Sequence, residues 1–364
     1  MSRSFRLARL AGIDIFVHPT FALLLVWVAA SSGLQGRTVG AAAEGVALML
    51  ALFGCIVLHE LGHALMARRF GIATKDITLL PIGGMARLER MPERPVQEFL
   101  VALAGPAVTL LIAVVLFAWL RVSGDWRPLE AISVGRGAFV EQIMVANVAL
   151  LLFNLLPAFP MDGGRVLRAV LAARTDYVSA TVRAASIGQG IAFLLALVGL
   201  FSNLFLVVVA FFIWIAAGEE AAAVQKRSAL AGVTVRAAMM TQLQTLTPAS
   251  TLGDAVELLL SGSQQDFPVL QRGALAGMLT RQRLIGALAS HGREAAVGPL
   301  MEESIAVTPD ELLEPMLTRL DATNTRSIAV VDEGRLVGLV TLDNVGELLM
   351  VRAADHRGGA PPVS

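Results

Sequence analysis

The stretch CIVLHELGHALMARR, Cys55 to Arg69, places two histidines and a glutamate inside an apolar run. The sequence before it, VGAAAEGVALMLALFG, is strongly apolar, and an arginine pair closes it. Ionisable groups are expensive inside a membrane, so they usually mark a functional site there. The position of His59, Glu60 and His63 therefore predicts a functional site within a membrane-spanning helix.

The composition of the whole chain is typical of a membrane protein. Its 364 residues are 55% hydrophobic and 16% charged, with a mean hydropathy of +0.69. The formal net charge is zero, which gives no electrostatic reason to expect a nucleic-acid partner. The single cysteine, Cys55, excludes an internal disulfide framework. It lies one helical turn before His59, and is either a small core residue or a neighbour of the site.

Several apolar runs are long enough, at about 20 residues, to cross a bilayer. The block 184–217 is too long for one span and breaks at GLFSNLF, Gly199 to Phe205, so it predicts a hairpin of two helices. We read the basic N-terminus as a cytoplasmic leader that runs into the first span. The expected fold is a multi-pass α-helical membrane protein with six transmembrane helices, near 14–32, 40–66, 97–120 and 139–160 and two within 184–217.

The distribution of basic residues predicts the orientation of these spans. An even number of spans puts both termini on one side, and the positive-inside rule makes that side the cytoplasm. Arginine far outnumbers lysine, which is typical of a GC-rich bacterial genome. The basic residues on the side of the termini are Arg3, Arg6, Arg9, Arg68, Arg69, Lys75, Arg87, Arg90, Arg94, Arg165, Arg168, Arg174 and Arg183, against Arg37, Arg121, Arg127 and Arg136 on the other.

The segment between the second and third spans, Ile72 to Pro95, is moderately apolar but too short and too broken to span. Pro81 and the Gly83-Gly84 pair interrupt it. It is either a hairpin that dips into the protein from the cytoplasmic side, where other helices satisfy its backbone, or an ordinary surface loop.

The spacing of His59 and His63 points to a metal. Residues four apart on a helix share a face, so both imidazoles can hold one ion. Glu60 lies beside them without being forced into the ligand set. Zinc hydrolysis needs this arrangement: two neutral imidazole ligands and a carboxylate that takes a proton from water. A hydrogen-bonded histidine pair is the structural alternative, but it leaves Glu60 uncompensated in lipid.

A third ligand is expected from FNLLPAFPMDGGRVLRAVL, Phe153 to Leu171. Zinc takes three protein ligands and keeps a fourth position open for water. Asp162 follows two prolines that break the fourth span and lies at a depth similar to that of His63. Alternatively, Asp162 merely ends a helix, with Gly163-Gly164 as the turn.

Two further polar residues lie on apolar segments. Asn154, two turns before Asp162, is expected to hold either a substrate backbone or a loop. His18, just inside the first span, either bonds near the site or caps the start of the helix, and we do not assign it as a ligand.

From about Gly232 the hydrophobicity falls to a level typical of a soluble domain. The sequence of this part repeats with an offset of 61 residues. Thr247-Pro248 pairs with Thr308-Pro309, and Gly277–Thr280 pairs with Gly338–Thr341. Each copy runs helix, strand, glycine turn, strand, helix. The repeat predicts two α/β modules packed as a pair.

The motifs together resemble the site-2 protease family of intramembrane zinc metalloproteases. HELGH within a span, joined to NLLPAFPMDGGR in a later one, carries the resemblance, and ALAGPAVTLL (Ala102 to Leu111) and VHPTF (Val17 to Phe21) also fit. The resemblance covers roughly residues 10–220. It implies one zinc per chain, held by His59, His63 and Asp162, with Glu60 as general base and later acid and Asn154 positioning the substrate.

The resemblance also implies the class of substrate. The family cuts transmembrane segments of other proteins, so the expected partner is a single-pass membrane protein such as a membrane-tethered regulator. It further implies that the segment 72–90 is a membrane-associated β element whose edge binds an unwound substrate by strand addition.

The repeat resembles tandem CBS domains, at 232–290 and 296–352, after a membrane domain (1–220) and a linker (221–231) and before a disordered tail (353–364). Such pairs commonly bind adenine nucleotides and regulate an attached domain. The ribose-binding pattern is incomplete here, because GMLTRQR has Arg283 and GLVTLDN has Asn344 at the acidic position. Thr280 and Thr341 remain as candidate weak nucleotide contacts. Ligand sensing and homodimerisation through this cytoplasmic pair both stay open.

Two other classes of function compete with the protease. CBS pairs also accompany membrane cation transporters, but a transporter predicts ionisable groups spread along a pathway, whereas here they gather at one depth. An inactive, protease-like scaffold is the other alternative, and the presence of every catalytic residue type argues against it.

Overall fold

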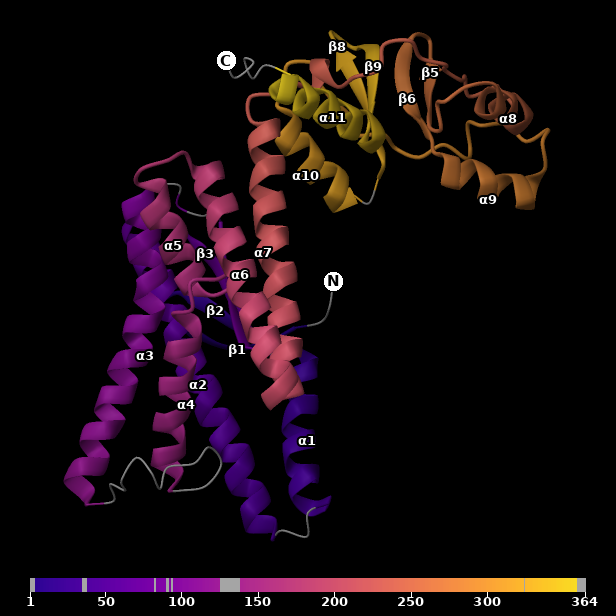
Figure 1. Cartoon of the computed structure of the whole chain (residues 1–364). Helices are drawn as coiled ribbons and strands as arrows, with labels where there is room; N and C mark the ends of the chain where they lie inside the picture. Colours follow the sequence, from indigo (N-terminus) through magenta and orange to yellow (C-terminus); the bar gives the residue numbers. More distant parts are fainter. Residues whose placement is uncertain are drawn as a thin grey trace, which may run out of the picture. The chain divides into compact units, whose positions relative to one another are not determined.

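The computed structural model describes residues 4–34, 38–81, 83–89, 92, 94–124, 138–323 and 325–358 (Figure 1). The chain divides into two compact units, Met1–Val224 and Gln225–Ser364. The first holds the apolar helices and a small sheet, and the second holds the repeat.

Among the described residues, four helices of the first unit are long and apolar enough to cross a membrane. Two further apolar helices are shorter. The structure therefore supports a multi-pass helical protein, while the count of six spans remains a prediction. The four are α2 (Val39–Arg69), α3 (Pro95–Ser123), α6 (Tyr177–Ser202) and α7 (Leu204–Leu230); the shorter ones are α1 (Pro19–Leu34) and α4 (Phe139–Asn154), and α5 (Asp162–Ala172) is a short amphipathic helix.

The N-terminal segment differs from the expected leader and first span. It forms β1 (Phe5–Leu10) and β2 (Ile13–Val17), an antiparallel pair joined by a turn at Ala11-Gly12, where both φ angles are positive. α1 begins only at Pro19, because proline suits the first turn of a helix. His18 caps that start: Thr20 N–H donates to its Nδ1 at 3.3 Å, so the capping interpretation fits the structure.

A four-stranded sheet lies beside α2. Its order is β1-β2-β3-β4, with β3 (Thr74–Leu80) parallel to β2 and antiparallel to β4 (Gly83–Leu88). The segment after α2 is thus a β-hairpin and not a loop, and β1 and β4 are the edges. One face of the sheet packs on α2 and α1 through the buried residues Ile13, Ile15, Phe21, Phe53, Val57, Leu61, Ala64, Ile77 and Leu79.

The chain bends sharply between α4 and α5. α4 ends at Asn154, earlier than the expected 160, and Asp162 starts α5. The interpretation of Asp162 as a helix end with a glycine turn is wrong. The two glycines lie in the first turn of α5, where a Cβ on Gly163 would meet the carbonyl oxygen of Leu156 at 2.3 Å and one on Gly164 would meet the backbone of Ala158 at 2.6 Å. Only glycine lets the helix lie this close to the loop before it.

The break between α6 and α7 falls at Asn203, within the predicted GLFSNLF turn. A Cβ on Gly199 would meet the Val207 side chain at 2.9 Å, so the two helices pack closely at this end.

The second unit consists of two similar α/β modules, each with its own core. The first module has α8 (Leu252–Ser261), β5 (Phe267–Gln271), β6 (Ala274–Leu279) and α9 (Arg281–His291). The second has β7 (Ala306–Val307), α10 (Leu313–Thr323), β8 (Ser327–Asp332), β9 (Arg335–Thr341) and α11 (Leu342–Gly358).

The modules exchange their leading segments. Val235 and Ala238, which precede α8 in the first module, lie in the core of the second, and Met240 pairs with Leu339. In the same way, Glu302 pairs with Met278. The exchange explains why two copies pack as one unit. At the C-terminus, α11 runs to Gly358, so the expected disordered tail is wrong for residues 353–358, and residues 359–364 lie outside the described residues.

Candidate metal centre

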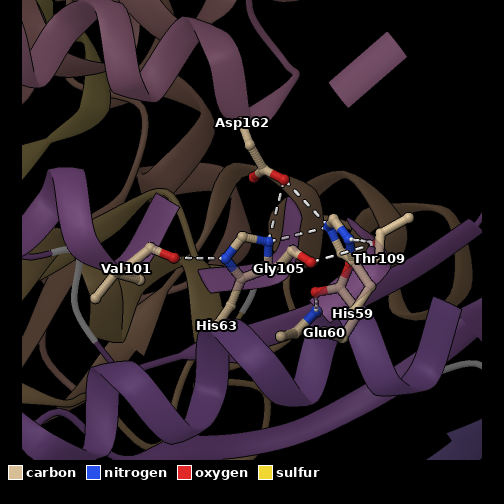
Figure 2. A network of polar contacts seen from close by, with 8 residues as sticks. His59, Glu60, His63, Val101, Gly105, Thr109 and Asp162 are labelled. Atoms are coloured by element: carbon tan, nitrogen blue, oxygen red, sulfur yellow. Dashed lines mark hydrogen bonds and ion pairs between the residues drawn. The ribbon is translucent and has the colours of Figure 1, made fainter. Parts of the chain in front are cut away.

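α2 presents the histidine pair on one buried face. His59 and His63 are one turn apart and are 4% and 5% exposed. Their rings stand edge to face with centroids 4.8 Å apart, and both Nε2 atoms point toward the same spot, 3.1 Å from each other (Figure 2).

Asp162 reaches the same spot from the start of α5. Its Oδ2 lies 3.1 Å from Nε2 of His59 and 3.1 Å from Nε2 of His63, and the side chain is buried. Among the described residues, these three form the group that could hold a metal ion. Asn154 is not part of the group: it is half-buried at the C-terminal end of α4. Cys55 is half-buried on α2 and also lies outside the group.

α3 fixes the tautomer of both imidazoles. The backbone carbonyl of Val101 lies 2.7 Å from Nδ1 of His63 and can only accept, so Nδ1 carries the proton. The Thr109 hydroxyl donates to the carbonyl of Gly105 at 3.3 Å, and its oxygen lies 2.8 Å from Nδ1 of His59, from which it accepts. In the neutral imidazole form, each ring therefore turns an unprotonated Nε2 toward Asp162 (Figure 2).

Gly105 makes room for this arrangement. It lies on α3 directly beside the cluster, where a Cβ would come within 2.2 Å of Nε2 of His63 and 2.7 Å of Nε2 of His59. No side chain fits there, so α3 approaches the two rings with bare backbone.

The cluster fits zinc. Two imidazole nitrogens and a carboxylate oxygen, all acceptors, lie 3.1 Å apart and would repel one another without a cation between them. In a tetrahedral site with bonds of about 2.0–2.1 Å, the ligand atoms are about 3.3 Å apart, close to the spacing found. Catalytic zinc sites typically have three protein ligands that bind the metal through nitrogen and oxygen atoms.

Glu60 lies next to the cluster, under the β-hairpin. The N–H of Ala86 in β4 donates to its Oε2 at 3.3 Å, and a Cβ on Gly84 would meet its Cγ at 2.9 Å. Strand β4 thus holds the carboxylate beside the metal-binding atoms without making it one of them.

Sequence reasoning missed three contributors from α3: the carbonyl of Val101, the bare backbone of Gly105 and the hydroxyl of Thr109. The run ALAGPAVTLL contained two of them. A glycine followed four residues later by threonine, in a span facing a histidine pair, is the signal that could have found them.

In the second unit, the modules enclose a cleft of about 1180 Å³. Thr280, Arg283, Thr341 and Asn344 all line it. Both threonines also have a structural role there, since Thr280 accepts from Arg283 N–H at the start of α9 and Thr341 accepts from Asn344 N–H at the start of α11. The cleft is large enough for a nucleotide, but N-capping alone accounts for the two hydroxyls.

Comparison with protein families gives two matches. Residues 47–134 and 129–197 match the model of Peptidase family M50, and residues 235–290 and 297–350 match that of the CBS domain.

The chain is also similar to individual proteins over nearly its whole length. A zinc metalloprotease of Methanocaldococcus jannaschii is 32% identical over 346 residues, which is 95% of this chain and 96% of that protein. Rip3 of Mycobacterium tuberculosis is 31% identical over 370 residues, covering 95% of this chain and 92% of the relative. A solved structure, the site-2 protease from M. jannaschii, covers 60% of this chain and 95% of its own, with 37% identity and a TM-score of 0.44.

Proposed function

This chain belongs to peptidase family M50, the site-2 type zinc metalloproteases, and on that basis we propose which residues perform the reaction. A protease of this family acts on membrane proteins within the bilayer. We assign His59, His63 and Asp162 as the ligands of one zinc per chain, and Glu60 as the catalytic base. The observation that carries the assignment is the convergence of three acceptor atoms at mutual distances of 3.1 Å.

Glu60 moves the proton in this proposal. Zinc, when bound, would polarise the scissile carbonyl and make a water molecule acidic enough to serve as nucleophile. Glu60 takes the proton of that water at a carboxylate oxygen and later delivers it to the leaving amine. Its place on α2 beside His59, outside the ligand set, supports both roles.

We assign the recognition of an unwound substrate to β4 and Asn154. A fully hydrogen-bonded helix hides its carbonyls, so the substrate segment must open before cleavage. β4 is an edge strand with one partner, β3, which suits strand addition. Its contact with Glu60 supports cleavage near this edge. Asn154 would hold the substrate backbone. The expected substrate is a single-pass membrane protein such as a membrane-tethered regulator.

We further propose six spans in the cell membrane, with both termini and the CBS pair in the cytoplasm of a bacterium. α1 and α4, the two shorter apolar helices, would then be spans as well. The apolar character of the six helices in the proposed membrane domain (1–220) supports this topology. The proposed linker (221–231) follows this domain. Several of the counted charges, Arg3, Arg37, Arg90, Arg127 and Arg136, lie outside the described residues.

The CBS pair, proposed at 232–290 and 296–352, fits a regulatory role. The cleft supports ligand sensing, and an adenine nucleotide is a candidate ligand, with weak contacts from Thr280 and Thr341. Homodimerisation through the pair is the other proposed role.

The findings disfavour the two alternative functions, a cation transporter and an inactive scaffold. Membership of a protease family, and the gathering of the buried histidines and Asp162 at one point, disfavour a cation transporter. The complete ligand set disfavours an inactive scaffold.

The zinc content of the purified full-length chain tests the ligand assignment. We expect about one zinc per chain in the wild type and in Glu60→Gln, and far less in His59→Ala, His63→Ala and Asp162→Ala. His18→Ala is the matched control, because this histidine caps α1 and should not affect zinc. If Asp162→Ala kept its zinc, or His18→Ala lost as much as His59→Ala, the assignment would be wrong.

A further inference from the structure

Arg168 is a fully buried arginine in α5, two turns after the start of that helix. It is one of the basic residues counted for the orientation of the spans, and no part of its side chain is exposed. Its guanidinium donates from Nε to Glu98 at 2.7 Å and from Nη1 to Glu220 at 2.6 Å. The rings of Phe159 and Tyr177 each lie 5.0 Å from its Cζ.

A buried charge of this kind needs an explanation beyond stability. Removing an ion from water costs so much that an apolar residue of similar volume often serves as well. The planar fork of arginine does offer something that neither an apolar residue nor lysine can, namely several donors in fixed directions. The positions of its partners therefore show what the residue holds in place.

The guanidinium of Arg168 links the segments before and after Asp162. Arg168 lies six residues, or about 9 Å, beyond Asp162 along α5. Phe159, whose ring lies against the guanidinium, precedes Asp162 by three residues in the loop that leads into α5. Rotation or sliding of α5, which would carry the Asp162 carboxylate away from the histidines, would break the contacts of Arg168.

The same guanidinium also fixes the helix that orients His63. Glu98 lies on α3, three residues before Val101, whose carbonyl accepts from Nδ1 of His63 at 2.7 Å. The ion pair thus joins one turn of α3 to α5. The metal-binding atoms come from α2 and α5. Because α3 orients His63 on α2, the Arg168–Glu98 ion pair sets the distance between the histidines and Asp162.

We propose that Arg168 is a positioning residue of the metal centre, which holds Asp162 at the correct distance from the histidine pair through Glu98 and Phe159. The inference rests on the proposed function for the identity of the zinc ligands. Glu98 is the partner that matters for the site, while Glu220, on α7 and partly exposed, mainly balances the charge.

The test compares full-length wild type with Arg168→Lys, Glu98→Gln and Glu220→Gln. Each is measured for zinc affinity by chelator competition, for the visible spectrum after Co²⁺ replaces zinc, and for Tm. We expect Arg168→Lys and Glu98→Gln to bind zinc about 10- to 100-fold more weakly, as changes of supporting groups around a metal do, and to shift the Co²⁺ spectrum. Glu220→Gln should stay within about threefold of wild type, because Glu220 lies on α7, which supplies none of the metal-binding atoms, and Arg168 keeps its bond to Glu98.

Leu120→Ala is the control for a merely structural effect. Leu120 is buried on α3 about 22 Å along the helix from Gly105, so the change should lower Tm and leave zinc affinity and the Co²⁺ spectrum unaltered. If Arg168→Lys does not fold, Glu98→Gln decides. Wild-type affinity and spectrum in Arg168→Lys or Glu98→Gln, or an equal loss in Glu220→Gln, would overturn the proposal. Failure of wild type to bind zinc would instead refute the proposed function.

Discussion

The Thr109 hydroxyl lies 2.8 Å from Nδ1 of His59, on the side of the ring away from Asp162. Because this hydroxyl also donates to the carbonyl of Gly105, it can only accept from the imidazole. The contact thereby leaves Nε2 free of a proton and turned toward the other metal-binding atoms. One side chain of α3 thus decides which nitrogen of a histidine on α2 can bind the metal.

Replacing Thr109 by valine tests this relationship. Valine keeps the shape but removes the acceptor, so we expect zinc affinity to fall about 10- to 100-fold. Thr109→Ser, which keeps the hydroxyl, should stay close to wild type. Chelator competition on the purified chain measures both. Equal affinities for the valine and serine variants would show that the hydroxyl does not orient His59.

Gly105→Ala should abolish or strongly reduce metal binding. The added methyl group would come within 2.2 Å of Nε2 of His63 and must displace the ring or α3. Gly190→Ala on α6 is the matched control, because a Cβ there has no neighbour within 4 Å. Alanine normally favours a helix over glycine by about 1 kcal/mol, so the control should be neutral or stabilising. Zinc content and Tm of the two variants distinguish the effects.

Gly84→Ala should impair the catalytic base without affecting zinc binding. Its methyl group would press on Cγ of Glu60 from β4, so we expect normal zinc content with a cleavage rate at least about tenfold lower, since misplaced catalytic groups cost rate steeply. A variant with wild-type cleavage would show that β4 does not set the position of Glu60.

Metal removal should be reversible. Chelation of the reconstituted enzyme is expected to abolish cleavage, and one equivalent of zinc per chain should restore it, because the proposed ligands come from helices that also pack through apolar cores. Retention of activity after complete, verified zinc loss would contradict a catalytic role for the metal.

In the CBS pair, Thr280→Ala should loosen the start of α9. Loss of an N-cap costs about 1 kcal/mol, which corresponds to about fivefold faster amide exchange in the first turn of the helix. Thr280→Ser should restore protection. Hydrogen exchange of the full-length chain without ligand measures this, and unchanged exchange in Thr280→Ala would mean that the hydroxyl does not cap the helix.

The sequence alone predicted that His59, His63 and Asp162 lie close together, because each position depends on a local pattern. Their role as zinc ligands stays a prediction. A four-residue spacing places His59 and His63 on one face of a helix. The prolines before Asp162 predict the bend that turns the Asp162 side chain inward. The 61-residue offset likewise predicted two modules, and Phe267 in β5 and Ile328 in β8 are buried strand residues at that spacing.

Other features depend on tertiary contacts that no local pattern contains. The short apolar run Ile13–Val17 fits a strand as well as the start of a helix, and its pairing with β1 and β3 makes it a strand. The buried position of Arg168 depends on α3 and α7, which supply its carboxylate partners Glu98 and Glu220. Gly105 is an unremarkable small residue until α3 is placed against the histidines.

Cleavage of a single-span model substrate, reconstituted in liposomes with either wild type or Glu60→Gln, tests the central claim most directly when zinc is quantified in both. We expect the wild type to cut within the hydrophobic segment, and Glu60→Gln to hold the same zinc while cutting at least about 100-fold more slowly, as loss of a general base implies. Equal cleavage by the two enzymes at equal zinc content would contradict the assignment of Glu60 as the base and, with it, the mechanism proposed for this site.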